Sequence, residues 1–164
     1  MKVANDMLSR RTMLFGAIGA GSAASLIGGP AGIRSLHAAP AANRGQVTLY
    51  KNPQCDCCEA YASYLGQQGF SVKVIPTNDL TAMGEKYGIP NSQDPCHISL
   101  IGGYVVGGHI PMEVSDRLLS EKPQITGINL PGMPAGMPGM PGNKPDRLSI
   151  YEIGKGSPKV YATV

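Results

Sequence analysis

The chain is poor in charge and contains no tryptophan. Among its 164 residues, Asp, Glu, Lys and Arg together account for 15%, and the formal net charge is only +3. This composition excludes an acidic disordered chain. It also excludes a nucleic-acid binder, because phosphate binding requires several clustered cations. The length predicts one ordinary domain with an additional short segment.

A long, strongly hydrophobic run is also lacking. The uncharged stretch from the Arg10-Arg11 pair to about Ile33 consists mainly of Gly, Ala and Ser, which is weakly hydrophobic for a stable membrane span. A cationic start, this stretch and an Ala-rich exit form the layout of a signal peptide, and the paired arginines indicate the twin-arginine route. We therefore expect a signal peptide at 1–41 and a periplasmic domain at 42–164, with no stable membrane anchor after cleavage.

The predicted signal peptide accounts for the positive charge of the chain. Residues 42–164 have no formal net charge, because the first 41 residues contain four cations and one acid: Lys2, Arg10, Arg11, Arg34 and Asp6. The periplasm is oxidising, so thiols exported to it tend to pair.

The remaining residues alternate strand and helix patterns. Strands are predicted at 46–50, 72–75, 97–101 and 104–107, and apolar residues at helical spacing predict helices that end near Gly69, Gly88 and Pro123. Asp79 is expected to cap the second helix, and Gly102-Gly103 is a hairpin signal. A long irregular stretch is expected next, with a closing hairpin formed by 147–153 and 159–164.

This order of elements is typical of an α/β fold of the thioredoxin or glutaredoxin type, in which helices flank a mixed sheet. The first two strands are joined by a helix and are therefore expected to be parallel, whereas the Gly-Gly hairpin is antiparallel. The C-terminal part adds a loop rich in Pro, Gly and Met at 131–142, followed by the closing hairpin.

Four cysteines carry the strongest chemical signal. Cys55, Cys57 and Cys58 lie between the first strand and the first helix, and Cys96 immediately precedes the third strand. In the expected fold, the start of the third strand approaches the N-terminus of the first helix. The four sulfurs and the imidazole of His97 are therefore expected to converge.

Three interpretations of the cysteines are open. Structural disulfides suit an exported protein, but a Cys55–Cys58 bond would close a very small loop. Thiol–disulfide exchange would use the C-x-x-C pair Cys55 and Cys58, because a helix N-terminus stabilises a thiolate, but it leaves Cys57 and Cys96 without a role. Metal binding uses all four. Their spacing differs from that of zinc and iron–sulfur sites and suits Cu(I), a soft ion.

Methionines and histidines add candidate ligands. Met133 and Met137 lie in the Pro/Gly-rich loop, where their thioethers either bind Cu(I) or pack over the domain as adaptable filler. His97 is a candidate ligand, a proton donor to a thiolate, or a hydrogen-bonded strand residue. His109, at the end of the hairpin, is a candidate if it faces the cluster.

Four motifs occur in order along the chain: YKNPQCDCC at 50–58, Cys96-His97, GGYVVGGHIP at 102–111 and LPGMP at 130–134. They resemble the signatures of an exported bacterial family long catalogued as a domain of unknown function, which includes CopG-type copper-resistance proteins. The resemblance spans about residues 46–164. It implies a thioredoxin-like fold and periplasmic Cu(I) binding by Cys55, Cys57, Cys58 and Cys96, with a link to copper redox state.

Residues and resemblance together predict a periplasmic protein that binds Cu(I) for copper tolerance or transfer. The alternative is a thiol–disulfide or copper oxidoreductase that uses Cys55 and Cys58, so whether the protein is an enzyme is open. A third possibility is a binding module for a partner such as a copper exporter or oxidase.

Overall fold

The structure is a computed structural model that describes residues 43–164. The predicted signal peptide at 1–41 lies outside the described residues. Within the described part, no helix is both long enough and apolar enough to cross a membrane.

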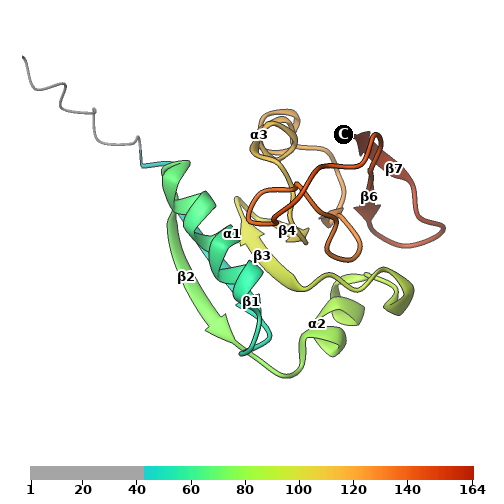
Figure 1. Ribbon diagram of the computed structural model, residues 1–164. Helices are drawn as coiled ribbons and strands as arrows, with labels where there is room; N and C mark the ends of the chain where they lie inside the picture. The colour runs from blue at the N-terminus through green and yellow to red at the C-terminus, as the bar shows by residue number, and fades with distance from the viewer. Residues whose placement is uncertain (1–42) are drawn as a thin grey trace, which may run out of the picture. The chain divides into compact units, whose positions relative to one another are not determined.

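Helices and strands are mixed up to Glu121, and the described chain beyond it consists of short strands joined by long loops (Figure 1). The elements are β1 (Gln46–Lys51), α1 (Asp56–Gln67), β2 (Ser71–Pro76), α2 (Leu80–Tyr87), the 3-10 helix η1 (Asn91–Gln93), β3 (His97–Ile101), β4 (Tyr104–Gly107), α3 (Met112–Glu121), β5 (Gly127–Asn129), β6 (Ser149–Ile153) and β7 (Val160–Thr163).

The seven strands form one mixed sheet in the order β2-β1-β3-β4-β5-β6-β7. The pairs β1–β2 and β4–β5 are parallel, and the other neighbours are antiparallel. Gly102 and Gly103 connect β3 to β4 with φ values of 56° and 90°, which is the positive-φ geometry of a tight hairpin. The predicted fold class, a mixed α/β sheet flanked by helices and ending in a hairpin, is confirmed.

Two details differ from the sequence-based expectation. The stretch expected to be irregular contains β5, a strand of only three residues that is too short to show alternation. A Cβ atom at its first residue, Gly127, would collide with the Val105 backbone, so the position requires a residue of weak strand propensity. Asp79 occupies the N-cap position of α2, but its side chain makes no capping hydrogen bond with a described residue.

The two faces of the sheet pack against different helices. The larger core cluster contains Leu49 of β1, Leu65 of α1 and Leu118 of α3, all fully buried. The smaller cluster contains Ile98 of β3, and Met83 of α2 packs against this cluster. Because successive strand residues point to opposite faces, β3 contributes to both clusters. The start of β3 is therefore enclosed from both sides.

Strand register brings distant segments of the chain to one end of the sheet. β1 and β3 are antiparallel, and Lys51 at the end of β1 pairs with His97 at the start of β3. Ile98 pairs with Gly107 at the end of β4. The end of β1, the start of β3 and the end of β4 consequently meet at the same end of the sheet. His97 begins β3, and the segments next to these strand ends carry the four cysteines and His109.

Candidate metal centre

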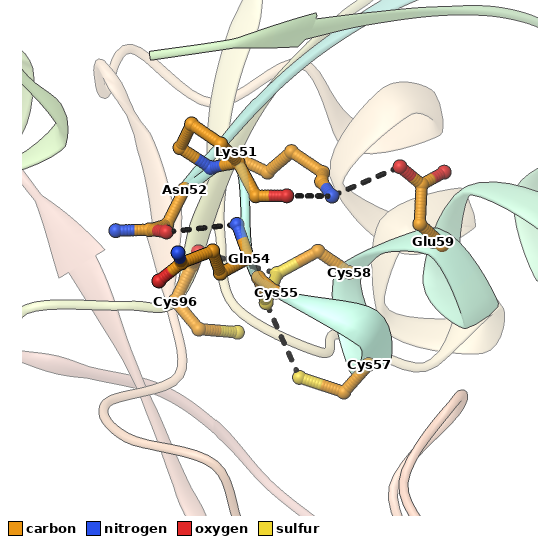
Figure 2. A network of polar contacts seen from close by, with 9 residues as sticks. Lys51, Asn52, Gln54, Cys55, Cys57, Cys58, Glu59 and Cys96 are labelled. Carbon is orange, nitrogen blue, oxygen red and sulfur yellow. Dashed lines mark hydrogen bonds and ion pairs between the residues drawn. A yellow bond between two sulfur atoms is a disulfide. The ribbon is translucent and has the colours of Figure 1, made fainter. Parts of the chain in front are cut away.

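A short turn carries the first cysteines from β1 into α1. The Cys55 amide donates to the Asn52 carbonyl oxygen over 3.1 Å. The Gln54 amide donates to the Asn52 side-chain oxygen over 3.0 Å, as Figure 2 shows. Pro53 suits such a turn because its φ is fixed near the value that the second position requires. Cys55 is the N-cap residue of α1, so Cys57 and Cys58 lie in the first helical turn.

The buried side chain of Lys51 contacts both this turn and helix α1. Its Nζ lies 2.9 Å from Glu59 Oε1 on α1 and donates to the Pro53 carbonyl oxygen over 3.3 Å (Figure 2). Lys51 itself is only 3% exposed. Because it contacts both the turn and the helix, Lys51 is a positioning residue for the cysteines. Lys51 is not among the site residues predicted from the sequence.

All four cysteine sulfurs lie within 4.8 Å of one another. Cys55 and Cys58 are joined by a disulfide, and Cys57 Sγ lies 3.4 Å from Cys55 Sγ. Cys96 reaches the same place from the start of β3, with its carbonyl oxygen 3.3 Å from Cys58 Sγ. Figure 2 shows its side chain directed at the first turn of α1. The predicted convergence of the four sulfurs is confirmed, and the small loop is accommodated at the helix N-terminus.

Two imidazoles contact Cys96 on its inner side. Cys96 Sγ lies 3.3 Å from His97 Nδ1 and 3.1 Å from His109 Nε2, and one donor atom from each of these three residues falls within 4.8 Å of the others. Both histidines are fully buried, whereas Cys96 is partly exposed. The structure therefore presents a second donor group that shares Cys96 with the first.

The orientation of His109 is determined by the Pro/Gly/Met-rich loop. His109 Nδ1 lies 2.7 Å from the Pro138 carbonyl oxygen, which can only accept, so Nδ1 carries the proton. In neutral His109, the lone pair of Nε2 then faces Cys96 Sγ. A carbonyl that holds one ring nitrogen while the other faces the site is the usual arrangement behind a metal-binding histidine.

Tyr61 of α1 packs against both imidazoles. Its ring centroid is 4.5 Å from that of His97 and 5.3 Å from that of His109, and its hydroxyl donates to the Ile110 carbonyl oxygen over 2.9 Å. Burial raises the pKa of this hydroxyl. Tyr61 therefore remains a neutral packing residue that restricts ring motion. Its position one helical turn after Cys57 and Cys58 was the available sequence signal.

Burial keeps the inner donors uncharged at neutral pH. Burial, together with the neighbouring Cys57, raises the pKa of the Cys96 thiol to about 12. Burial, together with the neighbouring His109, lowers the pKa of His97 to about 3. The pKa of His109 is also lowered by burial, against the opposing hydrogen bond to Pro138. A cation at this site would replace the thiol proton.

The two candidate methionines occupy different environments. Pro95 forms an isolated parallel bridge with Gly132, which places the adjacent Met133 beside the cysteines. Met133 is 57% exposed, and its sulfur lies 3.8 Å from Cys57 Sγ. Met137 is 2% exposed and belongs to the larger core cluster. The structure thus places Met133 at the thiols and gives Met137 a packing role.

The chain is similar to proteins that are named for copper resistance. A family model described as "Protein of unknown function, DUF411" matches residues 93–140, which include Cys96, His97 and His109. Two solved structures named "Copper resistance protein copG", Form 1 and Form 2, are each 30% identical to the chain, with TM-scores of 0.65 and 0.63. Each matches 73% of this chain, and the matches span 96% and 97% of the two solved chains. The chain belongs to the CopG family of copper resistance proteins.

No significant match was found among curated proteins. The family membership confirms the resemblance drawn from the four motifs. In this CopG-family chain, the predicted site residues Cys55, Cys57, Cys58 and Cys96 lie together, with His97, His109 and Met133 in contact with them. Their function as metal ligands stays a prediction.

An open cleft runs along the outer side of the thiols. Its volume is about 480 Å³, and its walls include Cys55, Cys57, Cys96, Pro95 and Met133. The two histidines are absent from its lining among the described residues. The cysteine side of the site is therefore accessible from solvent, and the histidine side faces the core.

Proposed function

We propose that the protein binds Cu(I) through the thiolates of Cys55, Cys57, Cys58 and Cys96 as a small thiolate-bridged cluster. The observation that carries the proposal is the presence of four sulfurs within 4.8 Å of one another at the edge of an open cleft. The copper resistance names of the two similar structures support the same metal.

The chemistry of the donors favours Cu(I) over other ions. Soft thiolate and thioether ligands select Cu(I), and Met133 supplies a thioether next to Cys57. Structural zinc sites instead use four separate tetrahedral ligands, typically from two well-spaced pairs. Three cysteines within four positions suit bridging by sulfur better.

The Cys55–Cys58 disulfide makes this binding dependent on redox state. A metal ligand must be a deprotonated thiol, so the two bonded sulfurs cannot contribute thiolates until the disulfide is reduced. Reduction would therefore switch on copper binding at the full cluster.

An anaerobic Cu(I) titration of the reduced protein against a competing chelator tests the proposal. We expect tight binding of more than one equivalent, and loss of this stoichiometry when all four cysteines are replaced by serine. Weak, sub-stoichiometric binding by the reduced wild-type protein would refute the proposed function.

We also propose that this copper handling takes place in the periplasm, after export by the twin-arginine route, with transfer to a partner such as a copper exporter or oxidase. The Arg10-Arg11 pair supports the route. Replacing both arginines by lysine should retain the protein in the cytoplasm on cell fractionation. Co-purification with and without copper tests for the partner.

The disulfide itself favours a second candidate, a thiol–disulfide oxidoreductase. Reduction of a substrate disulfide would convert the Cys55 and Cys58 thiols into the bond seen here, passing two electrons and two protons to the substrate. Cys58→Ser should then abolish disulfide reductase activity. An inactive wild-type protein would dismiss this candidate.

A further inference from the structure

We propose that Cys96, His97 and His109 form a second site, sharing Cys96 with the cluster, that binds one Cu(I) ion while Cys55 and Cys58 remain joined as a disulfide. This inference rests on the proposed copper function and extends it to the oxidised protein. Oxidation would then reduce the amount of copper bound without releasing all of it.

Four cysteine sulfurs and two imidazoles are the six donors of the two groups. The disulfide removes two of these sulfurs but leaves Cys96 and both imidazoles available. Cys57 and Cys96 remain free thiols, and both imidazoles keep their contacts with Cys96 Sγ. The remaining donors are therefore two sulfurs and two nitrogens, and the proposed site uses one of these sulfurs, that of Cys96, with both nitrogens. Cys96 belongs to both donor groups, so copper could pass between them without leaving the protein.

The distances suit a common metal ion. With metal–nitrogen and metal–sulfur bonds of about 2.0 and 2.3 Å, a nitrogen and a sulfur on one ion lie about 3.5 Å apart at tetrahedral angles and about 3.7 Å apart at trigonal angles. The sulfur of Cys96 lies 3.3 Å from His97 Nδ1 and 3.1 Å from His109 Nε2. An outward movement of a few tenths of an ångström would seat the ion, which the partly exposed Cys96 side chain can provide.

The surroundings fix the imidazoles as ligands in advance. The Pro138 carbonyl holds the proton of His109 on Nδ1, which directs the Nε2 lone pair at Cys96. Tyr61 packs on both rings. His97 Nδ1 already faces Cys96 Sγ, and a metal ion bound at Nδ1 would leave the ring proton on Nε2.

One thiolate and two imidazoles form a donor set used by copper proteins. A trigonal site of two histidines and one cysteine binds copper, whereas hard oxygen donors would favour magnesium or calcium. The histidines are fully buried, and Cys96 lines the cleft. Copper would therefore enter past Cys57 and Cys96, which line the cleft, and reach the buried imidazoles last.

The experiment uses the oxidised protein, verified to contain two free thiols by thiol counting. Cu(I) is titrated anaerobically against a competing chelator, and imidazole NMR signals are recorded in parallel. We expect one equivalent of Cu(I), with shifts in the signals of His97 and His109. His109→Gln in the oxidised protein should weaken binding about tenfold or more. His97→Gln provides an independent test if the first variant does not fold.

Cys57→Ser is the matched control, because it removes the other free thiol and leaves the three proposed donors. It should retain the single copper in the oxidised protein. Loss of binding in this variant, or unchanged binding in both histidine variants, would overturn the inference. Copper binding by the reduced protein alone would overturn the inference and leave the proposed function standing. Failure of the reduced protein alone would refute the proposed function, and failure of both forms would refute both.

Discussion

At the scale of single residues, Met133 differs from the buried Met112 and Met137 because its side chain lies outside the hydrophobic core. It is exposed, it contacts Cys57, and the loop bridge between Pro95 and Gly132 holds it beside the cleft. An exposed soft ligand next to a thiol is suited to exchanging Cu(I) with an incoming donor.

Met133→Leu should weaken Cu(I) binding or speed up its loss to a chelator. The side-chain size is nearly conserved while the sulfur ligand is removed. Because Met133 is exposed, the free energy of unfolding should change by less than about 0.5 kcal/mol. Stopped-flow chelator competition measures the exchange, and Met140→Leu in the same loop is the control. Identical exchange kinetics in wild type and Met133→Leu would argue against a ligand at this position.

His97 should make the metal-free protein less stable in acid. Its folded-state pKa is about 3, against an ordinary value of 6.5, so the unfolded chain binds the additional proton between these values. The contribution of His97 to the free energy of unfolding is therefore fully present above pH 6.5 and is lost as the pH falls from 6.5 towards 3. Urea unfolding of wild type and His97→Gln across this range measures the difference. Parallel stability curves would show that His97 does not titrate in this way.

At the scale of elements, the end of β4 depends on a glycine. Gly108 has a φ of 76°, and an added Cβ atom would collide with the Leu130 carbonyl oxygen. Its amide donates to the His97 carbonyl oxygen over 3.0 Å. Gly108, which directly follows β4, thus forms a backbone hydrogen bond with the first residue of β3.

Gly108→Ala should destabilise the fold by more than about 1 kcal/mol, because the backbone conformation and the close contact both oppose a side chain. Chemical denaturation measures the loss. Gly154→Ala is the control: its φ is not positive and no described atom lies within 4 Å of the added Cβ, so a change below about 0.5 kcal/mol is expected. Equal effects in the two variants would contradict the proposed steric role.

At the scale of the whole molecule, the site joins segments that are distant in sequence. The turn after β1, the start of β3, the end of β4 and the loop before β6 all contribute atoms to it. A ligand that bridges these segments binds the folded protein better than the unfolded chain and therefore stabilises the fold.

Cu(I) should accordingly raise the melting temperature of the reduced protein. At a free Cu(I) concentration one hundred times the Kd, the expected gain is about 2.7 kcal/mol, less any binding to unfolded thiols. Calorimetry of the reduced protein in a Cu(I) buffer measures it. The variant with all four cysteines replaced by serine should show no increase. An unchanged melting temperature in the wild type would indicate that copper does not bridge these segments.

The sequence alone was sufficient for most of the secondary structure. Hydrophobic periodicity and the Gly and Pro signals that end elements are local, so β1 to β4, the three α-helices and the closing hairpin were predictable within a few residues. The cysteine cluster was also visible, because three of its members lie within four positions. β5 was missed because a three-residue strand beginning with Gly127 carries no local signal and exists only through pairing with its neighbours.

Only the tertiary structure determined which residues complete the site. His109 and Pro138 are far apart in sequence, yet one imidazole contacts both Cys96 and the Pro138 carbonyl. Met133 and Met137 look equivalent in the sequence, yet one lies at the thiols and the other in the core. These differences arise from strand register and loop packing, which depend on contacts across the whole sheet. Local sequence therefore determined the elements and the chemistry available, and long-range packing decided which donors meet.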